Sequence, residues 1–127
     1  MLAAVAIPNL LRARLNANES AAIGNMHTLV QALGSYQANQ NPPTYPSSLT
    51  DLATVNPPYI DSVLASGIKQ GYQFIYTPGT PDERGAINDY TLRAIPVVEG
   101  KTGVRHFFAD ESGVIRVGDD ASGTPLE

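Results

Sequence analysis

The chain has 127 residues, enough for one domain, and its hydrophobic content of 43% allows a small core. Eight basic residues against twelve acidic ones give a formal net charge of −4, with no basic stripe, which argues against a nucleic-acid partner. The absence of cysteine excludes thiol catalysis, cysteine-ligated metals and disulfides.

A short apolar run opens the chain, from Met1 to Pro8. The apolar stretch is too short for a membrane-spanning helix, which needs about 20 residues, and it lacks the flanks of a signal peptide. We therefore interpret residues 2–8 as the remnant of a longer hydrophobic helix, in an N-terminally truncated, soluble chain. Leu126 and Glu127 after a polar stretch are typical of a cloning scar.

The first segment, residues 1–40, is predicted to be one long helix. Apolar residues between positions 11 and 36 recur at steps of three, four or seven, which is the spacing of one helical face, over residues 9–38. Such a helix would extend about 45 Å, so its N-terminal end is expected to project beyond the globular part. Glu19 and Asn25 are expected off the apolar face. Gly24 and Gly34 are expected at points of close packing or bending.

The second segment, residues 41–70, is predicted to be an irregular αβ connection with a short helix. Ser48 and Asp51 are spaced as a capping box, which places the start of this helix at Ser48. Pro57 and Pro58 are expected to end it, and residues 59–66 are expected to form a further turn.

The third segment, residues 71–118, changes to a period of two, which is typical of strands. The alternation predicts strands at residues 72–76, 89–95, 104–109 and 114–117, and residues 119–127 are predicted to be a flexible tail. The expected fold class is α+β, with one long N-terminal helix packed on a three- to four-stranded antiparallel sheet. The predicted helix–sheet core consists of Met26, Leu29, Leu33, Tyr36, Tyr72, Phe74 and Tyr76.

Candidate catalytic groups are few. His27 and His106 are the only histidines, and we interpret them as polar residues of the surface or of a sheet face rather than as a catalytic pair. The chain carries no nucleophile-elbow, zinc-protease or phosphate-loop pattern. We therefore expect that the protein is not an enzyme.

Carboxylates gather near the C-terminus, where Asp110, Asp119 and Asp120 are candidate calcium ligands. Calcium takes six to eight oxygen ligands, and the spacing here does not match an EF-hand. We favour solvated turns and expect no cofactor, with calcium as the alternative.

Two stretches carry a resemblance to a known family. Residues 2–14 (LAAVAIPNLLRAR) resemble the second half of the N-terminal helix of type IV pilins and of type II secretion pseudopilins. Pro8 occupies the position of the proline that kinks that helix, and residues 44–52 (TYPSSLTDL) resemble the segment that follows it in many pseudopilins. The resemblance covers roughly the first 55 residues and implies a pilin-like fold.

The resemblance implies a structural filament subunit that polymerises through its N-terminal helix to support protein secretion or pilus formation. Its implied partners are copies of itself, other pilins or pseudopilins, the inner membrane through a full-length helix, a prepilin peptidase that leaves a methylated first residue, and an assembly platform. The implied location is the bacterial inner membrane before assembly, and then a periplasmic or extracellular filament. The residues implied in polymerisation and membrane contact are Leu2, Val5, Ile7, Pro8, Leu10, Leu11, Arg12 and Arg14.

Several alternatives stay open at this point. Arg12 and Arg14 could contact lipid headgroups, pair with acidic groups of neighbouring subunits, or only keep an exposed helix face soluble. The missing cysteine pair and the Tyr45–Pro46 segment favour a secretion pseudopilin, whereas the missing calcium loop favours a pilus subunit, so both stay open. The alternative function is a membrane-anchored extracytoplasmic binding module without polymerisation, in which the sheet and the loop at residues 78–88 present a ligand surface.

Overall fold

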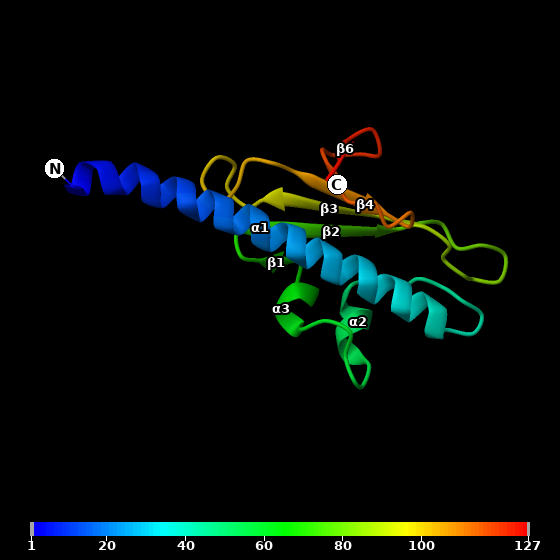
Figure 1. Cartoon of the computed structure of the whole chain (residues 1–127). Helices are drawn as coiled ribbons and strands as arrows, with labels where there is room; N and C mark the ends of the chain where they lie inside the picture. Colours follow the sequence, from blue (N-terminus) through cyan, green and yellow to red (C-terminus); the bar gives the residue numbers. More distant parts are fainter. Residues whose placement is uncertain (1, 127) are drawn as a thin grey trace.

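A computed structural model describes the backbone of residues 2–126 and the side chains of residues 10–126. The chain has an α+β fold with one long N-terminal helix and a six-stranded antiparallel sheet (Figure 1). The helices are α1 (Leu2–Asn39), α2 (Thr50–Thr54) and α3 (Ser62–Ala65). The strands follow one another in the sheet in chain order and are β1 (Ile68–Lys69), β2 (Tyr72–Pro78), β3 (Tyr90–Pro96), β4 (Phe107–Asp110), β5 (Arg116–Val117) and β6 (Thr124–Pro125).

Helix α1 crosses the sheet and continues beyond it at the N-terminal end, as Figure 1 shows. Met26, Leu29 and Leu33 are fully buried in the core, which fits a single apolar face toward the sheet. The expectation that Glu19 and Asn25 lie off this face is wrong, because both are buried, with 8% and 9% of their surface exposed. Each has a polar partner that offsets the cost of burial; Asn25 donates to Gln70 Oε1 at 3.2 Å.

Strands β2 and β3 form the centre of the sheet and pair along their full length, from Tyr72 opposite Pro96 to Pro78 opposite Tyr90. Their alternation places Tyr72, Phe74 and Leu92 in the core that α1 covers. Tyr36 and Tyr76, the other aromatic residues predicted for this core, are partly buried and pack against it.

The predicted strand count is wrong, since the sheet has six strands instead of three or four. The additional strands β1 and β6 have two residues each, which is too short to show an alternating pattern in the sequence. The prediction that residues 119–127 form a flexible tail is also wrong in part, because β6 lies within them. Leu126 donates its N–H to the Ile115 carbonyl at 2.9 Å and packs against the core.

The segment between α1 and the sheet contains two short helices, and its predicted capping box does not form. Helix α2 begins at Thr50 instead of Ser48, without a side-chain cap. The Asp51 carboxylate instead accepts hydrogen bonds from the backbone N–H and the hydroxyl of Ser47, at 3.3 and 2.9 Å. Helix α3 is capped by Asp61, which accepts the Leu64 N–H at 2.7 Å.

The prediction of close packing at the helix glycines is not met within the chain. Gly24 and Gly34 are both exposed, and a Cβ added at either would meet nothing within 4 Å. The kink that the resemblance implies at Pro8 falls on a residue whose side chain lies outside the described ones. No helix among the described residues combines the length and the apolar character that a membrane crossing requires.

Candidate functional site

The projecting end of α1 is the first candidate site. Leu10 and Leu11 are exposed there, at 62% and 48%, and the side chains of Arg12 and Arg14 are exposed beside them. Leu11 and Leu15 lie on the same helical face as the buried Met26, because they are spaced four residues apart and Met26 follows Leu15 by eleven residues, about three helical turns. This apolar face therefore continues past the part of α1 that the sheet covers. The other residues predicted for polymerisation, Leu2, Val5, Ile7 and Pro8, lie outside the described side chains.

Glu19 anchors the loop between β3 and β4 to α1 at the point where the helix leaves the sheet. Its Oε2 accepts the backbone N–H groups of Val104 and Arg105, each at 2.9 Å, and its Oε1 accepts the Arg105 Nε–H at 3.0 Å. Burial raises the pKa of Glu19, but the two backbone donors and the Arg105 guanidinium outweigh it and bring the pKa below its ordinary value. The carboxylate therefore stays charged and joins two parts of the chain that are remote in sequence.

The same loop is fastened from a second side by Tyr72. The Tyr72 hydroxyl donates to the Arg105 carbonyl at 2.7 Å, and the Arg105 guanidinium lies 5.3 Å from the centre of the Phe107 ring. Burial, together with the nearby Glu19 charge, raises the pKa of Tyr72 to about 12. The phenol is therefore a permanent hydrogen-bond donor rather than an acid of the neutral pH range.

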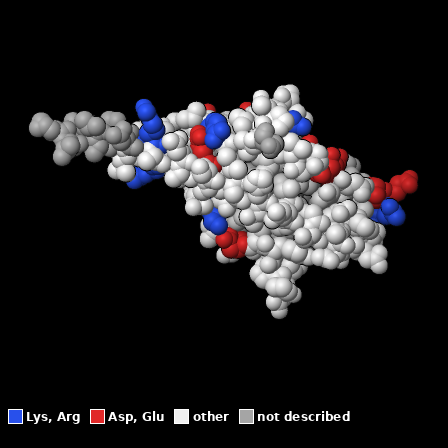
Figure 2. All heavy atoms as spheres, viewed as in Figure 1, with Lys and Arg blue, Asp and Glu red and all other residues white. Residues whose placement is uncertain are grey.

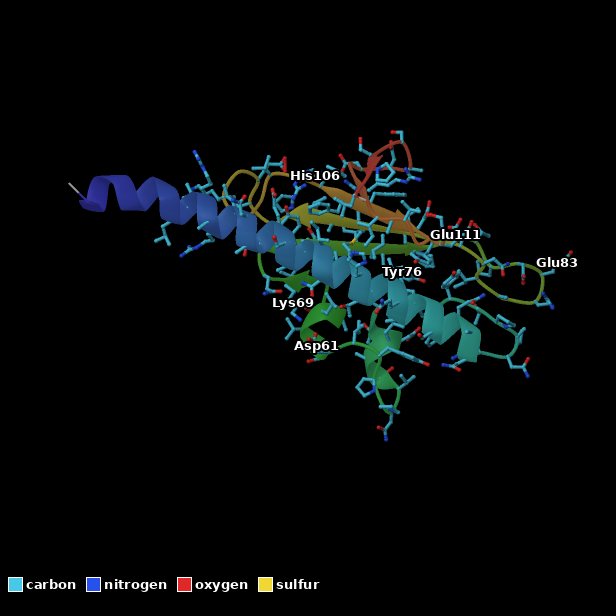
Figure 3. All side chains as sticks on the ribbon, in the orientation of Figure 1. Asp61, Lys69, Tyr76, Glu83, His106 and Glu111 are labelled. Carbon is cyan, nitrogen blue, oxygen red and sulfur yellow. The ribbon has the colours of Figure 1, made fainter. Side chains whose placement is uncertain are left out.

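His106, labelled in Figure 3, stands at the centre of a second charged cluster. Its Nε2 lies 2.7 Å from Glu99 Oε1, and its Nδ1 lies 2.8 Å from Asp119 Oδ1. Arg93 on β3 donates to the same Asp119 oxygen at 2.9 Å. The hydrogen bonds to Glu99 and Asp119 raise the pKa of His106 above its ordinary value, although partial burial opposes them. The bonds from His106 and Arg93 lower the pKa of Asp119.

The two histidines are not brought together. His27 is exposed on α1, and both ring nitrogens of His106 are engaged by carboxylates. Among the described residues, no group of three or more His, Cys, Asp or Glu side chains is arranged to hold a metal ion.

Each candidate calcium ligand has partners of its own. Asp110 Oδ1 accepts from the backbone and hydroxyl of Ser112, at 3.0 and 2.5 Å, and Asp120 Oδ1 accepts from the same groups of Ser122. Asp119 is held by His106 and Arg93. These are the local turns that short polar side chains form with the following backbone.

Tyrosines fix the segment after α1 onto the sheet. Tyr45 packs edge-on against Tyr90 with ring centres 4.9 Å apart, and Tyr36 packs in the same way against Tyr59 at 6.2 Å. The Tyr76 hydroxyl donates to the Pro46 carbonyl at 2.6 Å. Tyr36, Tyr45 and Tyr59 therefore serve core and loop packing.

An apolar groove of about 710 Å³ lies between α1 and the C-terminal strands. Its walls are Ile23 and His27 from α1, Val114 to Arg116 from the chain entering β5, and Pro125 and Leu126. A smaller pocket of about 210 Å³ is bordered by Asp89, Asp110 and Glu111. Neither pocket was visible in the sequence, because its walls come from segments that are far apart in the chain.

Glu19 and the His106 cluster were also missed by sequence reasoning. The spacing held one signal for Glu19, since it lies four residues after Leu15 and three before Ala22, in step with the buried face.

Comparison with protein-family models, with curated proteins and with solved structures found no match to this chain.

Proposed function

We propose that this protein is the structural subunit of a pilin-like filament and that it polymerises through the projecting end of α1. The observation that carries the proposal is the exposure of Leu10 and Leu11, at 62% and 48%, on a helix whose later turns are buried against the sheet. Apolar surface of this kind gains free energy when another surface covers it. A contact of about 200 Å² would contribute about 5 kcal/mol at 25 cal/mol per Å².

The shape of the subunit favours an open polymer. Helix α1 projects from one end only, so a copy that receives it presents its own projecting end to the next copy (Figure 1). Contacts between unlike surfaces that do not close on themselves produce filaments rather than rings. The pilin-like arrangement, with a long helix laid on an antiparallel sheet, is part of this proposal.

The distribution of charge adds support. Arg12 and Arg14 lie on the projecting end, and basic side chains are seen there in Figure 2. At the opposite end Asp89, Asp110 and Glu111 border one pocket, and Glu83 lies in the nearby loop after β2 (Figure 3). Opposite charges at opposite ends favour head-to-tail association and speed the encounter between copies.

The wider setting of the proposal follows the resemblance of residues 2–14 to pilins and pseudopilins. A hydrophobic segment preceding residue 2 would hold the subunit in the inner membrane before a prepilin peptidase and an assembly platform act on it. The assembled filament would then lie in the periplasm or outside the cell and serve protein secretion or pilus formation.

The test is the intact mass and first residue of the native protein from the membrane fraction of its source cell. Prepilin processing predicts a mature chain that begins about 15 residues ahead of Leu2, with an N-methylated first residue. These residues would complete a helix of about 20 apolar residues. An uncleaved helix, or cleavage after an ordinary signal peptide, would contradict it. Loss of exoprotein secretion in a deletion strain would indicate a pseudopilin, and loss of surface fibres would indicate a pilin.

The groove of about 710 Å³ favours a second candidate, a membrane-anchored binding module. This alternative predicts a protein that stays monomeric with its complete N-terminal helix and that binds an apolar ligand beside Ile23 and Val114. Sedimentation of the complete protein separates the two candidates, because only the filament subunit would form large assemblies.

A further inference from the structure

Two segments that are distant in sequence meet at the His106 ring. Glu99 belongs to the loop at residues 97–104, between β3 and β4, and Asp119 belongs to the turn at residues 118–123, between β5 and β6. Glu99 Oε1 lies 2.7 Å from Nε2, and Asp119 Oδ1 lies 2.8 Å from Nδ1. One imidazole ring therefore links both segments to the start of β4.

The geometry specifies the protonation state of the ring. An ionised carboxylate accepts hydrogen bonds and donates none, so both ring nitrogens must carry a proton to satisfy both contacts. Only the imidazolium has two N–H groups. A neutral ring would direct the lone pair of one nitrogen at a carboxylate oxygen, and one of the two links would be lost.

The charges around the ring come from three elements. Glu99 comes from the loop and Asp119 from the turn after β5. Arg93 comes from β3 and does not bond to the ring itself, but donates to Asp119 at 2.9 Å. Arg105, the neighbour of His106 in sequence, is directed to Glu19 instead. The two carboxylates carry two negative charges and the guanidinium carries one positive charge. The imidazolium adds a second positive charge, which balances the cluster.

We propose that Glu99, His106 and Asp119 form a proton-dependent clamp that fastens the 97–104 loop and the 118–123 turn to β4 when the ring is charged and releases one of them when it is neutral. The loop carries the exposed side chains of Val97, Val98 and Val104, so the clamp fixes the arrangement of an apolar surface. This device depends on the folded chain alone, whether or not the protein forms filaments.

The direction of the pH response follows from the folded-state pKa of His106, which is raised. The stabilising contribution is fully present below the ordinary histidine pKa of 6.5 and is lost as the pH rises through the folded-state value. The Glu19 anchor on the other side of the loop does not respond in this range, because its own pKa is lowered. A pH above the folded-state pKa of His106 should therefore release the loop or the turn from the ring and leave the loop attached to α1 through Glu19.

A nitrogen-15 NMR titration of the His106 ring tests the clamp. We expect both ring nitrogens to be protonated below pH 6.5, and the ring to titrate at higher pH in the folded chain than in the same chain unfolded in urea. The amide of the released segment should lose protection against hydrogen exchange over the same pH range. The Gly118 N–H, which donates to the His106 carbonyl at 2.8 Å, reports the turn, and the Gly100 N–H, which donates to the Gly103 carbonyl at 2.8 Å, reports the loop. Each unit by which the fold raises the pKa corresponds to about a tenfold loss of protection.

Three variants complete the test. Glu99→Gln should lower the folded-state pKa of His106. His106→Gln should leave the amide of the released segment, Gly118 or Gly100, weakly protected at every pH. His27→Gln, which removes the exposed histidine of α1, is the matched control and should change neither property. A ring that titrates at no higher pH in the folded chain than in urea, or a Glu99→Gln chain whose His106 titrates as in the wild type, would overturn the proposal.

Discussion

The Glu19 carboxylate on α1 is bonded twice to Arg105, through its backbone N–H at 2.9 Å and its Nε–H at 3.0 Å, although the two residues lie 86 positions apart. Among the residues whose side chains the structure describes, Glu19 is the first buried residue of α1. Its hydrogen bonds to Val104 and Arg105 hold the β3–β4 loop against α1. It also marks the boundary between the buried part of α1 and the part that projects.

This anchor should contribute measurably to stability. In Glu19→Ala the N–H groups of Val104 and Arg105 lose a charged acceptor, which should lower the free energy of unfolding by about 2 kcal/mol. Urea denaturation followed by circular dichroism measures the change. Glu83→Ala, in the exposed loop after β2, is the matched control and should stay within about 0.5 kcal/mol of the wild type. Equal losses in the two variants would show that Glu19 anchors nothing.

The contribution of Glu19 should also depend on pH. Its folded-state pKa lies below the ordinary value of 4.5, so the carboxylate stabilises the fold above that value and loses this effect as the pH falls through the lowered pKa. The difference in urea midpoint between the wild type and Glu19→Gln should therefore be constant near neutral pH and shrink in acid. A difference that stays unchanged down to about pH 2 would contradict the assignment.

Gly103 should not tolerate a side chain. It is buried, and a Cβ at this position would overlap the ring and hydroxyl of Tyr72. Gly103→Ala should therefore displace Tyr72 from the Arg105 carbonyl and lower stability by about 2 kcal/mol. The melting temperature reports the loss, and the Arg105 amide signal should shift with it. A variant as stable as the wild type would mean that the loop does not pack on Tyr72 in this way.

The helix glycines should behave in the opposite manner. Gly24 and Gly34 are exposed in α1 with open space around them, so Gly24→Ala and Gly34→Ala should each stabilise the chain by about 1 kcal/mol. Thermal unfolding of the two variants gives the answer. A loss of stability in either would indicate a contact of the glycine that the structure does not contain.

Sequence reasoning predicted those parts of the fold that show a period. The steps between Met26, Leu29 and Leu33 identified the buried face of α1, and the alternation of Tyr72 and Phe74 identified the central strand β2. Strands β1 and β6 are held by pairing with neighbours rather than by a pattern of their own.

The polar clusters could not be predicted for a different reason. Glu19 bonds to residues 85 and 86 positions away, and His106 joins carboxylates on either side of it in sequence that only the fold brings to one ring. Single residues with such distant partners leave no spacing to recognise. The exception is Glu19 itself, whose position in step with Leu15 and Ala22 marks it as a carboxylate on a buried face.

Polymerisation through α1 predicts that folding and assembly can be separated by substitution. Leu10 and Leu11 are exposed, so replacing both with Asn should change the free energy of unfolding by less than about 0.5 kcal/mol. Leu33→Ala, in the core, should cost about 3 kcal/mol and serves as the contrast. Urea denaturation of the three chains establishes whether the double variant is folded before its assembly is examined.

The most direct test of self-assembly is electron microscopy of the native protein from its source cell, beside the Leu10→Asn, Leu11→Asn double variant. We predict fibres from the wild type and folded, dispersed subunits from the variant. A wild-type protein that stays monomeric at every concentration, or a double variant that still forms the same fibres, would contradict assembly through the projecting end of α1.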